Sequence, residues 1–247
     1  MTDRKVALVT GGTSGIGRAC AYGLQRAGYH VAICGRREIE LNSAQQDGQL
    51  DFAKSCDVTD SQSVASLFAA ILGRFGRIDV VFNNAGRAVP TRNFGDLDIE
   101  GWKEMVDTNL NGAFYVAREA FRAMRAQSPQ GGRIINNGSI SAHVPRYGAA
   151  PYASTKHAIT GLTKSISLDG RAFNIACGQI DIGNTLTDMT RDMSAGMPQA
   201  DGTLKQEPTF GVKHVVEAVL YMAGLPLEAN VQFMTVMARA MPYVGRG

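Results

Sequence analysis

The chain has 247 residues, of which 45% are apolar and 19% are charged, and its formal net charge is +3. This composition excludes an intrinsically disordered protein and allows a substantial buried core. The small charge gives no reason to expect binding to nucleic acid or to a membrane surface.

The sequence also lacks the usual signs of a membrane anchor, a secretion signal or a metal site. No apolar run approaches the ~18 residues of a membrane-spanning helix, and the N-terminus enters a strand pattern without a signal peptide of normal length. The four cysteines are scattered without a Cys-x-x-Cys pair, which predicts neither zinc nor a disulfide framework. Cys20, Cys34 and Cys56 fall in apolar stretches that suit a reducing compartment. We therefore expect a cytoplasmic protein without a metal ion.

The first predicted elements are a strand, a glycine turn and a helix. Val6–Val9 is a short apolar run, and residues 10–17 read Thr-Gly-Gly-Thr-Ser-Gly-Ile-Gly before a helical pattern that lasts to about Ala27. This order forms the first half of a dinucleotide-binding βαβ unit. The glycines let the backbone approach a pyrophosphate, while the N-terminus of the helix offers free N–H groups and a partial positive charge. The alternative is a glycine-rich turn that binds nothing.

The second predicted strand, about His30–Cys34, ends in Gly35-Arg36-Arg37. A site for NAD would usually place a carboxylate here to bind the ribose 2′-hydroxyl, but the first acidic residue is Glu38. Two guanidinium groups could instead pair with a 2′-phosphate. The sequence therefore predicts NADP(H) in preference to NAD(H), unless the two arginines are solvated loop residues.

Two further strands are predicted to end at polar corners. The third, about Phe52–Cys56, ends in Asp57-Val58 and precedes a helical pattern at about 61–75. The fourth, Ile78–Phe82, runs into Asn83-Asn84-Ala85-Gly86. Asparagine side chains at such a corner can bond to neighbouring backbone, and the small residues leave room for a ligand.

A longer helical pattern spans about 98–126 and is expected to contain two segments that meet near Asn109-Leu110-Asn111-Gly112. Its apolar residues exceed what one face of a sheet needs. These residues are Leu110, Phe114, Val116, Ala120 and Met124.

The fifth predicted strand, Gly132–Asn137, leads to Ser139 and then to a helix that begins near Pro151. Ligands of open parallel sheets bind beyond the carboxyl ends of the strands. Ser139, the glycine turn at 10–17 and the corner at 83–86 all fall there. Tyr152 and Lys156 lie one turn apart on the same helical face. An ammonium beside a phenol stabilises the phenolate, which suits the tyrosine to act as an acid or base. The plainer alternative is an amphipathic helix whose lysine reaches solvent.

Together these motifs resemble the short-chain dehydrogenase/reductase family over nearly the whole chain. The Thr-Gly-x-x-x-Gly-x-Gly turn is similar to its cofactor motif, and residues 83–86 match its Asn-Asn-Ala-Gly without a change. A serine thirteen residues before a Tyr-x-x-x-Lys pair also matches. The matching single positions are Gly11, Gly15, Gly17, Ser139, Tyr152 and Lys156.

The resemblance implies a Rossmann-like, doubly wound α/β sheet of about seven parallel strands with helices on both faces, in a single NAD(P)-binding domain over residues 1–247. It also implies hydride transfer between a nicotinamide and a carbonyl or alcohol carbon. In that reaction Tyr152 would exchange a proton with the substrate oxygen, and Ser139 would hydrogen-bond the same oxygen. Lys156 would hold the nicotinamide ribose, and Asn109, at a helix break, would support a proton relay through water.

By the same resemblance, the cofactor would lie along the carboxyl ends of the strands. Asp57-Val58 resembles the family position that contacts the adenine ring. Ser14 argues slightly against NADP(H), because many NADP-using relatives carry a basic residue there. The positions expected to bind the cofactor are Gly11, Thr13, Ser14, Gly15, Ile16, Gly17, Arg36, Arg37, Asp57, Val58, Asn83, Ala85, Gly86, Tyr152, Lys156, Gly178 and Ile180.

Three neighbouring residues compete with the predicted catalytic ones. Ser141 is a rival to Ser139, but the family's spacing to the tyrosine favours Ser139. Tyr147 has no lysine one turn on, because position 151 is proline. His143 could bond to a substrate, although a plain loop residue is the expectation.

After the catalytic helix, the sequence departs from the family's pattern. The link after Leu168 is several residues shorter than usual, and the family's Pro-Gly corner reads Cys177-Gly178. The threonine often found four residues after that glycine bonds the nicotinamide carboxamide. Here Ile182 takes its place, and an alkyl group cannot make that bond. Asn184 or Thr185 could stand in for it.

Residues 184–210 are rich in methionine, glycine and polar side chains. The resemblance makes this segment the substrate loop, and flexible thioethers suit an adaptable apolar wall. A loop this long is more often functional than idle, but its composition names no substrate. A helix at about 212–223 and a strand at about 231–236 close the fold. Family helices equivalent to residues 98–126 build a two-fold interface, so a homodimer or homotetramer is expected.

The leading prediction is therefore an NADP(H)-dependent carbonyl reductase or alcohol dehydrogenase that acts on a small molecule. A reductase of 3-oxoacyl thioesters is an alternative, and it would favour a basic surface for an acidic carrier, with Arg87, Arg92 and Arg146 as candidates. A second alternative is a non-catalytic NAD(P)-sensing protein, although such relatives usually lose the tyrosine or the lysine.

Overall fold

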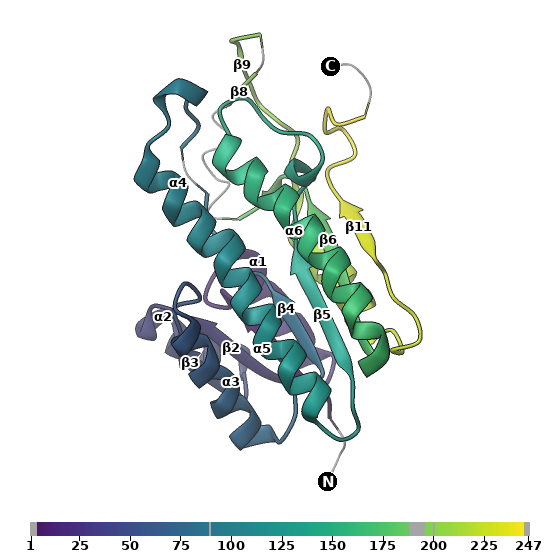
Figure 1. The fold of residues 1–247 in the computed structure, drawn as a ribbon. Coiled ribbons are helices and arrows are strands. Elements are labelled where there is room, and N and C mark those ends of the chain that lie inside the picture. The colour runs from purple at the N-terminus through teal and green to yellow at the C-terminus, as the bar shows by residue number, and fades with distance from the viewer. Residues whose placement is uncertain (1–3, 89, 188–195, 200, 245–247) are drawn as a thin grey trace.

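The structure is a computed structural model, and it describes residues 4–88, 90–187, 196–199 and 201–244. Its centre is a seven-stranded sheet in the order β11-β6-β5-β4-β1-β2-β3, in which every pairing is parallel. Helices cover both faces of this sheet (Figure 1). The Rossmann-like, doubly wound α/β fold predicted from the sequence is confirmed.

The elements of this fold have the following bounds. The strands of the main sheet are β1 Val6–Thr10, β2 His30–Gly35, β3 Phe52–Ser55, β4 Val80–Asn83, β5 Gly132–Asn137, β6 Ile175–Ile182 and β11 Phe233–Val236. The α-helices are α1 Gly15–Arg26, α2 Glu38–Gly48, α3 Ser61–Phe75, α4 Ile99–Val106, α5 Gly112–Ala126, α6 Ala150–Asp169 and α7 Lys213–Gly224. Two short ladders join β7 Thr185–Leu186 to β10 Phe210–Gly211 and β8 Met197–Pro198 to β9 Leu204–Lys205.

Most elements lie within a few residues of their predicted bounds, and the fifth strand has the bounds predicted. The break in the long helical pattern is a π-helical turn at Asp107–Asn111, between α4 and α5. The sequence does not predict α2. Only Leu41 and Ala44 of that helix are buried, so its apolar stripe is too thin to recognise.

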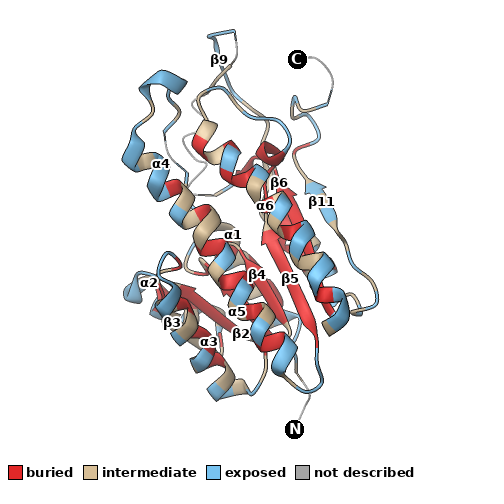
Figure 2. Cartoon of the chain, in the orientation of Figure 1, coloured by how far each residue is buried: buried red, intermediate tan, exposed pale blue. Residues whose placement is uncertain are grey.

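The two faces of the sheet carry separate apolar cores, and the strands β4, β5 and β6 between them are buried (Figure 2). Side chains of α1, α2 and α7 pack on one face, and those of α3 and α5 pack on the other. Helix α6 packs on β6 and also contacts α4 and the π-helical turn that precedes α5 (Figure 1). A polar layer between α6 and the sheet is formed by the buried side chains of Asn136, Thr163 and Gln179. Two members of this polar layer, Asn136 and Gln179, lie in the carboxyl-terminal halves of β5 and β6.

The strand order reverses at β1, which pairs with β2 on one side and β4 on the other. Ligands of open α/β sheets bind in the crevice at such a point, where the turn after β1 and the corner after β4 both lie. All four cysteines are buried and free, and burial raises the pKa of Cys20 to about 12. Within the described residues, no helix has the length and apolar character needed to cross a membrane, and no cluster of His, Cys, Asp or Glu suits a metal ion.

Candidate active site

The glycine turn after β1 packs against the corner after β4. Gly11 (φ +64°) and Gly15 (φ +52°) have left-handed conformations that other residues rarely adopt. A Cβ at Gly17 would lie 2.2 Å from the carbonyl oxygen of Gly11, so the close approach of α1 to the turn requires glycine. The Thr10 hydroxyl accepts the backbone N–H of Asn84 at 2.9 Å, which ties the two corners together.

Helix α1 begins at the end of this turn without a side-chain cap. Ser14 is the N-cap residue, but its hydroxyl makes no capping hydrogen bond, and the first turn of the helix has no acidic residue. The partial positive charge at the helix N-terminus is therefore not offset by an acidic side chain. The methyl of Thr13 packs against Gly35 at the end of β2, and the side chain of Ile16 packs partly against the core. A turn and helix start of this kind fit a pyrophosphate.

The two arginines after β2 differ in their partners. Both are exposed. Arg37 is the N-cap of α2, and its Nη1 lies 2.9 Å from Glu40 Oε1. Arg36, by contrast, forms no ion pair with any acidic residue in the described part of the chain. Of the two guanidinium groups, that of Arg36 is the more available to a phosphate.

The pair after β3 has structural contacts of its own. Asp57 Oδ1 accepts the backbone N–H of Thr59 at 3.0 Å and the Thr59 hydroxyl at 2.9 Å. Val58 is buried against the start of α5, where a Cβ at Gly112 would lie 2.9 Å from Val58 Cγ2. These contacts keep the pair at the carboxyl edge of the sheet.

The asparagines of the corner after β4 hold neighbouring elements. Asn83 Nδ2 donates to the carbonyl oxygen of Ala113 at 2.8 Å and to Asn136 Oδ1 at 3.1 Å. Asn84 Nδ2 donates to the carbonyl oxygen of Thr10 at 2.9 Å. The predicted bonding of these side chains to backbone is confirmed. Ala85 and Gly86 follow at the same edge of the sheet, and both are at least partly exposed.

Lys156 connects α6 with the end of β5. Its side chain is buried, its Nζ donates to the carbonyl oxygen of Asn137 at 2.6 Å, and Nζ lies 5.5 Å from the centre of the Tyr152 ring. Asn137 continues the connection, because its Nδ2 donates to Asn84 Oδ1 at 2.9 Å. The lysine thus contacts both the tyrosine and the end of β5, which Asn137 joins to the corner after β4. Tyr152 itself is partly exposed.

Ser139 begins the turn after β5 and is buried. Its backbone N–H donates to Asp181 Oδ1 at 3.0 Å, and its Oγ accepts the backbone N–H of Ser141 at 3.1 Å. The hydroxyl hydrogen of Ser139 thus remains available for a substrate oxygen. The rival Tyr147 is half exposed, and its hydroxyl accepts a hydrogen bond from Asn93 Nδ2 at 3.3 Å.

Asn109 lies in the π-helical turn, and its side chain is committed to the protein itself. Its Oδ1 accepts the backbone N–H of Arg87 at 2.8 Å, and its Nδ2 donates to the Arg87 carbonyl oxygen at 2.9 Å and to Met105 Sδ at 2.9 Å. These bonds fix the chain after the β4 corner against the helix break. Any role in a proton relay therefore falls to the backbone carbonyl of Asn109.

The corner after β6 is not where the sequence predicts it. Strand β6 runs unbroken to Ile182, so Gly178 and Ile180 lie inside it. A Cβ at Gly178 would lie 2.0 Å from the carbonyl oxygen of Val231, and Ile180 is completely buried in the core. The prediction of a cofactor corner at Cys177-Gly178 is therefore wrong, because this glycine serves close packing within the sheet and not a turn.

The strand ends before Gly183, and the segment that follows returns to the glycine turn. Thr187 lies four residues after Gly183, and its Cβ and Cγ2 would be 3.7 Å from a Cβ at Gly15. The spacing from glycine to threonine is thus present when it is counted from Gly183. The link from Leu168 to this corner also has no shortening, because β6 continues past Gly178 and the corner lies at Gly183. Thr187 is the residue that the sequence prediction missed, and this spacing was the signal for it.

The predicted substrate loop lies partly outside the described residues, which omit 188–195 and 200. Its described ends are joined where β7 pairs with β10. Glu207 Oε2 lies 2.5 Å from Arg146 Nη2 and accepts a hydrogen bond from Asn184 Nδ2 at 2.7 Å. Asn184 and Thr185 are both buried. The ends of the loop are therefore attached to the chain that follows Ser139.

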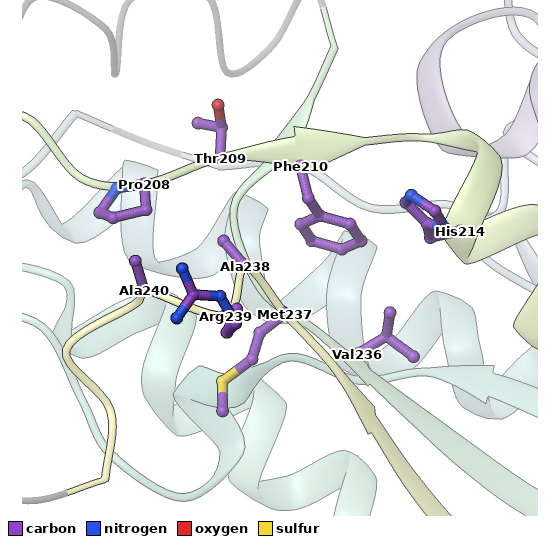
Figure 3. A pocket seen from close by; sticks show the side chains of 9 residues that line it. All are labelled: Pro208, Thr209, Phe210, His214, Val236, Met237, Ala238, Arg239 and Ala240. Atoms are coloured by element: carbon purple, nitrogen blue, oxygen red, sulfur yellow. The ribbon is translucent and has the colours of Figure 1, made fainter.

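A cavity of about 560 Å³ opens beside the end of this loop, between β10, the start of α7 and the chain after β11 (Figure 3). It adjoins the β6 corner, because a Cβ at Gly183 would lie 2.7 Å from Met237 Cβ. None of the predicted catalytic residues lines it. The lining residues are Pro208, Thr209, Phe210, His214, Val236, Met237, Ala238, Arg239 and Ala240.

The chain is similar to known oxidoreductases. The family model described as short chain dehydrogenase matches residues 5–198. A 3beta-hydroxysteroid dehydrogenase of Mediterraneibacter gnavus is 36% identical over 198 residues, which are 78% of this chain and 70% of that protein. A gluconate 5-dehydrogenase of Gluconobacter oxydans is 34% identical over 228 residues, which cover 88% of this chain and 87% of that protein.

A solved structure of a ketoreductase is also similar to this chain. The crystal structure of a variant actinorhodin polyketide ketoreductase with NADPH is 28% identical and has a TM-score of 0.85, and the match covers 96% of this chain and 97% of that one. The family match spans most of the sequence, and the fold and the site motifs agree with it. The chain therefore belongs to the short chain dehydrogenase family of NAD(P)-dependent oxidoreductases.

Proposed function

We propose that this protein is an NADP(H)-dependent oxidoreductase that interconverts a carbonyl and an alcohol on a small-molecule substrate. The observation that carries the proposal is the position of Lys156, whose Nζ lies between the Asn137 carbonyl oxygen and the Tyr152 ring. A phenol, a buried ammonium and the adjacent Ser139 turn suit proton transfer to and from an oxygen atom.

When bound, the nicotinamide supplies or accepts the hydride. Tyr152 gives its phenolic proton to the carbonyl oxygen during reduction and takes it back during oxidation. The ammonium of Lys156 stabilises the phenolate that remains and holds the nicotinamide ribose. Ser139 donates its hydroxyl hydrogen to the same oxygen, since its Oγ already accepts the N–H of Ser141. The backbone carbonyl of Asn109 supports the water that returns the proton.

The cofactor is assigned to the crevice beside β1. The glycine turn and the N-terminus of α1 would hold the pyrophosphate, and Asp57-Val58 would contact the adenine. Thr187 would bond the nicotinamide carboxamide, in place of the positions predicted inside β6. The exposed Arg36, which no described carboxylate neutralises, supports NADP(H) over NAD(H).

The two alternatives receive less support. A carrier-bound acyl thioester would need a basic surface beside the site, but Arg87 pairs with Glu104 and Arg146 pairs with Glu207. These ion pairs reduce the positive charge that an acidic carrier would meet. A non-catalytic sensor would have no use for a proton donor at Tyr152.

We also propose that residues 1–247 form one domain, that the protein is cytoplasmic, and that it assembles as a homodimer or homotetramer. The side chains that support an interface over α4 and α5 are Trp102, which is 38% exposed, and Phe114, which is 45% exposed. Aromatic side chains of this kind are enriched in interfaces between subunits.

The proposal is tested with a panel of ketones, sugars, acyl thioesters and alcohols, each assayed with NADPH or NADH for reduction and with NADP⁺ or NAD⁺ for oxidation. Turnover is followed by the nicotinamide absorbance. We expect NADPH to bind more tightly than NADH and to be oxidised by at least one carbonyl compound. Failure to bind either cofactor would contradict the proposal.

A further inference from the structure

We propose that the carboxylate of Asp181 and the imidazole of His143 form a positioning pair that fixes Ser139 for its part in the reaction. The inference rests on the proposed function, because it assigns supporting residues to the same site. It goes beyond the sequence prediction, in which His143 is a plain loop residue and Asp181 has no role.

The carboxylate of Asp181 is completely buried and makes three polar contacts. Its Oδ1 accepts the backbone N–H of Ser139 at 3.0 Å and Nε2 of Gln179 at 2.7 Å. Its Oδ2 lies 2.8 Å from His143 Nε2. An ionised carboxylate only accepts hydrogen bonds, so Nε2 of the imidazole carries the hydrogen and donates it. The carboxylate therefore joins the Ser139 backbone to a histidine on the same turn.

Gly138, the residue before Ser139, leaves the space that the Asp181 carboxylate occupies. A Cβ at Gly138 would lie 2.1 Å from Asp181 Oδ1, so a larger residue there would displace the carboxylate. The N–H of Gly138 donates to the carbonyl oxygen of Ile180 at 2.8 Å. Two successive N–H groups, those of Gly138 and Ser139, are thus tied to β6. The glycine before the predicted catalytic serine is explained by this contact.

The other side of the carboxylate is held by the polar layer between α6 and the sheet. Asn83 donates to Asn136, Asn136 Nδ2 donates to Thr163 Oγ1 at 2.9 Å, and Thr163 Oγ1 donates to Gln179 Oε1 at 3.1 Å. Gln179 then donates to Asp181 at 2.7 Å. This chain of hydrogen bonds begins at the corner after β4 and ends at the serine turn, so it connects the two edges of the proposed site.

A buried carboxylate lowers the stability of the fold unless its desolvation is offset. Desolvation of an ionised group costs several kcal/mol unless hydrogen bonds and a cation offset it, and an apolar residue of similar volume often serves a core position better. In the described part of the chain, no lysine or arginine pairs with Asp181, and the side chain that faces its Oδ2 is the imidazole of His143. This desolvation cost falls on the residue that holds the backbone of Ser139, whose hydroxyl is proposed to bind the substrate oxygen. The position of the carboxylate therefore points to a role in the site and not only in the fold.

The two members of the pair differ in exposure. Asp181 has no exposed surface, whereas the His143 side chain is 41% exposed. The C-terminal segment also comes near the carboxylate, because burial and the negative charge of Asp181 raise the pKa of Tyr243. His143 is therefore the accessible end of a buried array, and it can be substituted without opening the core.

The array controls the direction of the Ser139 hydroxyl. Asp181 holds the serine backbone, and the N–H of Ser141 donates to Ser139 Oγ at 3.1 Å, so the hydroxyl hydrogen points away from the turn. Loosening of the turn would misdirect this hydrogen without changing the glycine turn that holds the cofactor. The pair should therefore affect kcat much more than cofactor affinity.

The test compares four variants of the pair and one control variant with the wild type in the full-length protein. His143→Leu removes the donor to Asp181, and His143→Gln keeps an N–H donor at a similar reach. Asp181→Asn keeps the shape but removes the charge, and Asp181→Leu removes both acceptors. His157→Gln is the matched control, because that histidine is also exposed but bonds to the carbonyl oxygen of Ala153.

Three quantities are measured: the affinity for NADPH by cofactor fluorescence, kcat and KM with the carbonyl compound that the wild type reduces fastest, and amide hydrogen exchange over residues 138–143. We expect His143→Leu to lower kcat about tenfold or more while the NADPH affinity and KM change about threefold at most. His143→Gln should recover most of kcat, and both Asp181 variants should speed exchange over 138–143.

Equal kcat in the wild type and His143→Leu would overturn the inference, as would equal losses in His143→Leu and His143→Gln. If the wild type reduces no compound in the panel, the proposed function fails, and the exchange measurement still decides whether Asp181 holds the serine turn. In that case unchanged exchange in Asp181→Asn would overturn the pair, and faster exchange would support it. If Asp181→Leu does not fold, the other three variants decide the question.

Discussion

Nζ of Lys156 lies 5.5 Å from the centre of the Tyr152 ring, and the two residues are one turn apart on α6. The same Nζ donates to the carbonyl oxygen of Asn137 at the end of β5. The position of the ammonium is thus fixed by the sheet as well as by its own helix. A helix and a strand end that share this bond form a rigid base for the proposed proton donor.

Arg36 is expected to set the preference for NADP(H). Arg36→Ala should weaken NADPH binding about 10- to 100-fold, because a charged hydrogen bond to the 2′-phosphate is lost. NADH binding should hardly change. Arg37→Ala should have a smaller effect, since Arg37 already pairs with Glu40. Dissociation constants for both cofactors check this, and an unchanged NADPH-to-NADH ratio in Arg36→Ala would refute the role of this arginine.

Thr187 is expected to contact the cofactor, because it lies beside the glycine turn. Thr187→Val keeps the shape and removes one hydroxyl, so it should weaken NADPH binding or lower kcat about threefold to tenfold. Thr203→Val is the control, since Thr203 is exposed and bonds to Asp201. Equal values for the two variants in both assays would remove Thr187 from the site.

Gly178 is expected to matter for stability and not for the cofactor. In Gly178→Ala the new methyl would meet the carbonyl oxygen of Val231 at 2.0 Å, and overpacking of this kind costs about 1–3 kcal/mol. The melting temperature should fall by several degrees, while the folded variant binds NADPH as the wild type does. A selective loss of NADPH affinity at an unchanged melting temperature would restore the corner predicted from the sequence.

Asp51 is expected to make stability depend on pH. Burial alone would raise the pKa of Asp51, but hydrogen bonds from Val31 and His30 and the charges of His30 and Arg4 outweigh it and lower the pKa. A carboxylate with a depressed pKa contributes stability above its unfolded pKa of about 3.9. That contribution is lost as the pH falls through the lower, folded pKa.

Urea denaturation of the wild type and Asp51→Asn at a series of pH values measures this contribution. The wild type should be the more stable at pH values above about 4, and the difference should shrink as the medium becomes more acidic. A difference that stays constant down to the acid limit would show that the Asp51 charge does not stabilise the fold.

The parts of the site that could be predicted from the sequence are those that depend on neighbouring residues. The glycine turn at 10–17 and the corner at 83–86 need small residues at fixed spacings, and these spacings are visible in the sequence. Tyr152 and Lys156 are one helical turn apart, so their common face follows from the period of the helix.

Contacts between distant strands could not be predicted in this way. Gly178 and Gly183 look alike in sequence, but the first makes room for Val231 and the second follows the end of β6. When the corner is placed at Gly178, the threonine expected four residues later falls on Ile182, and Thr187 is missed. The pairing of His143 with Asp181 joins residues 38 positions apart, and it depends on the register of β5 and β6, which no local pattern specifies.

The central claim is that Tyr152 carries the proton in a hydride-transfer reaction, and Tyr152→Phe tests it most directly. The variant keeps the ring beside Lys156 and removes only the phenolic hydroxyl. We measure NADPH affinity and the rate of NADPH oxidation by the carbonyl compound that the wild type reduces fastest. The account predicts a rate at least about 100-fold lower, with NADPH affinity within about threefold of the wild type. A variant that retains the wild-type rate would contradict it.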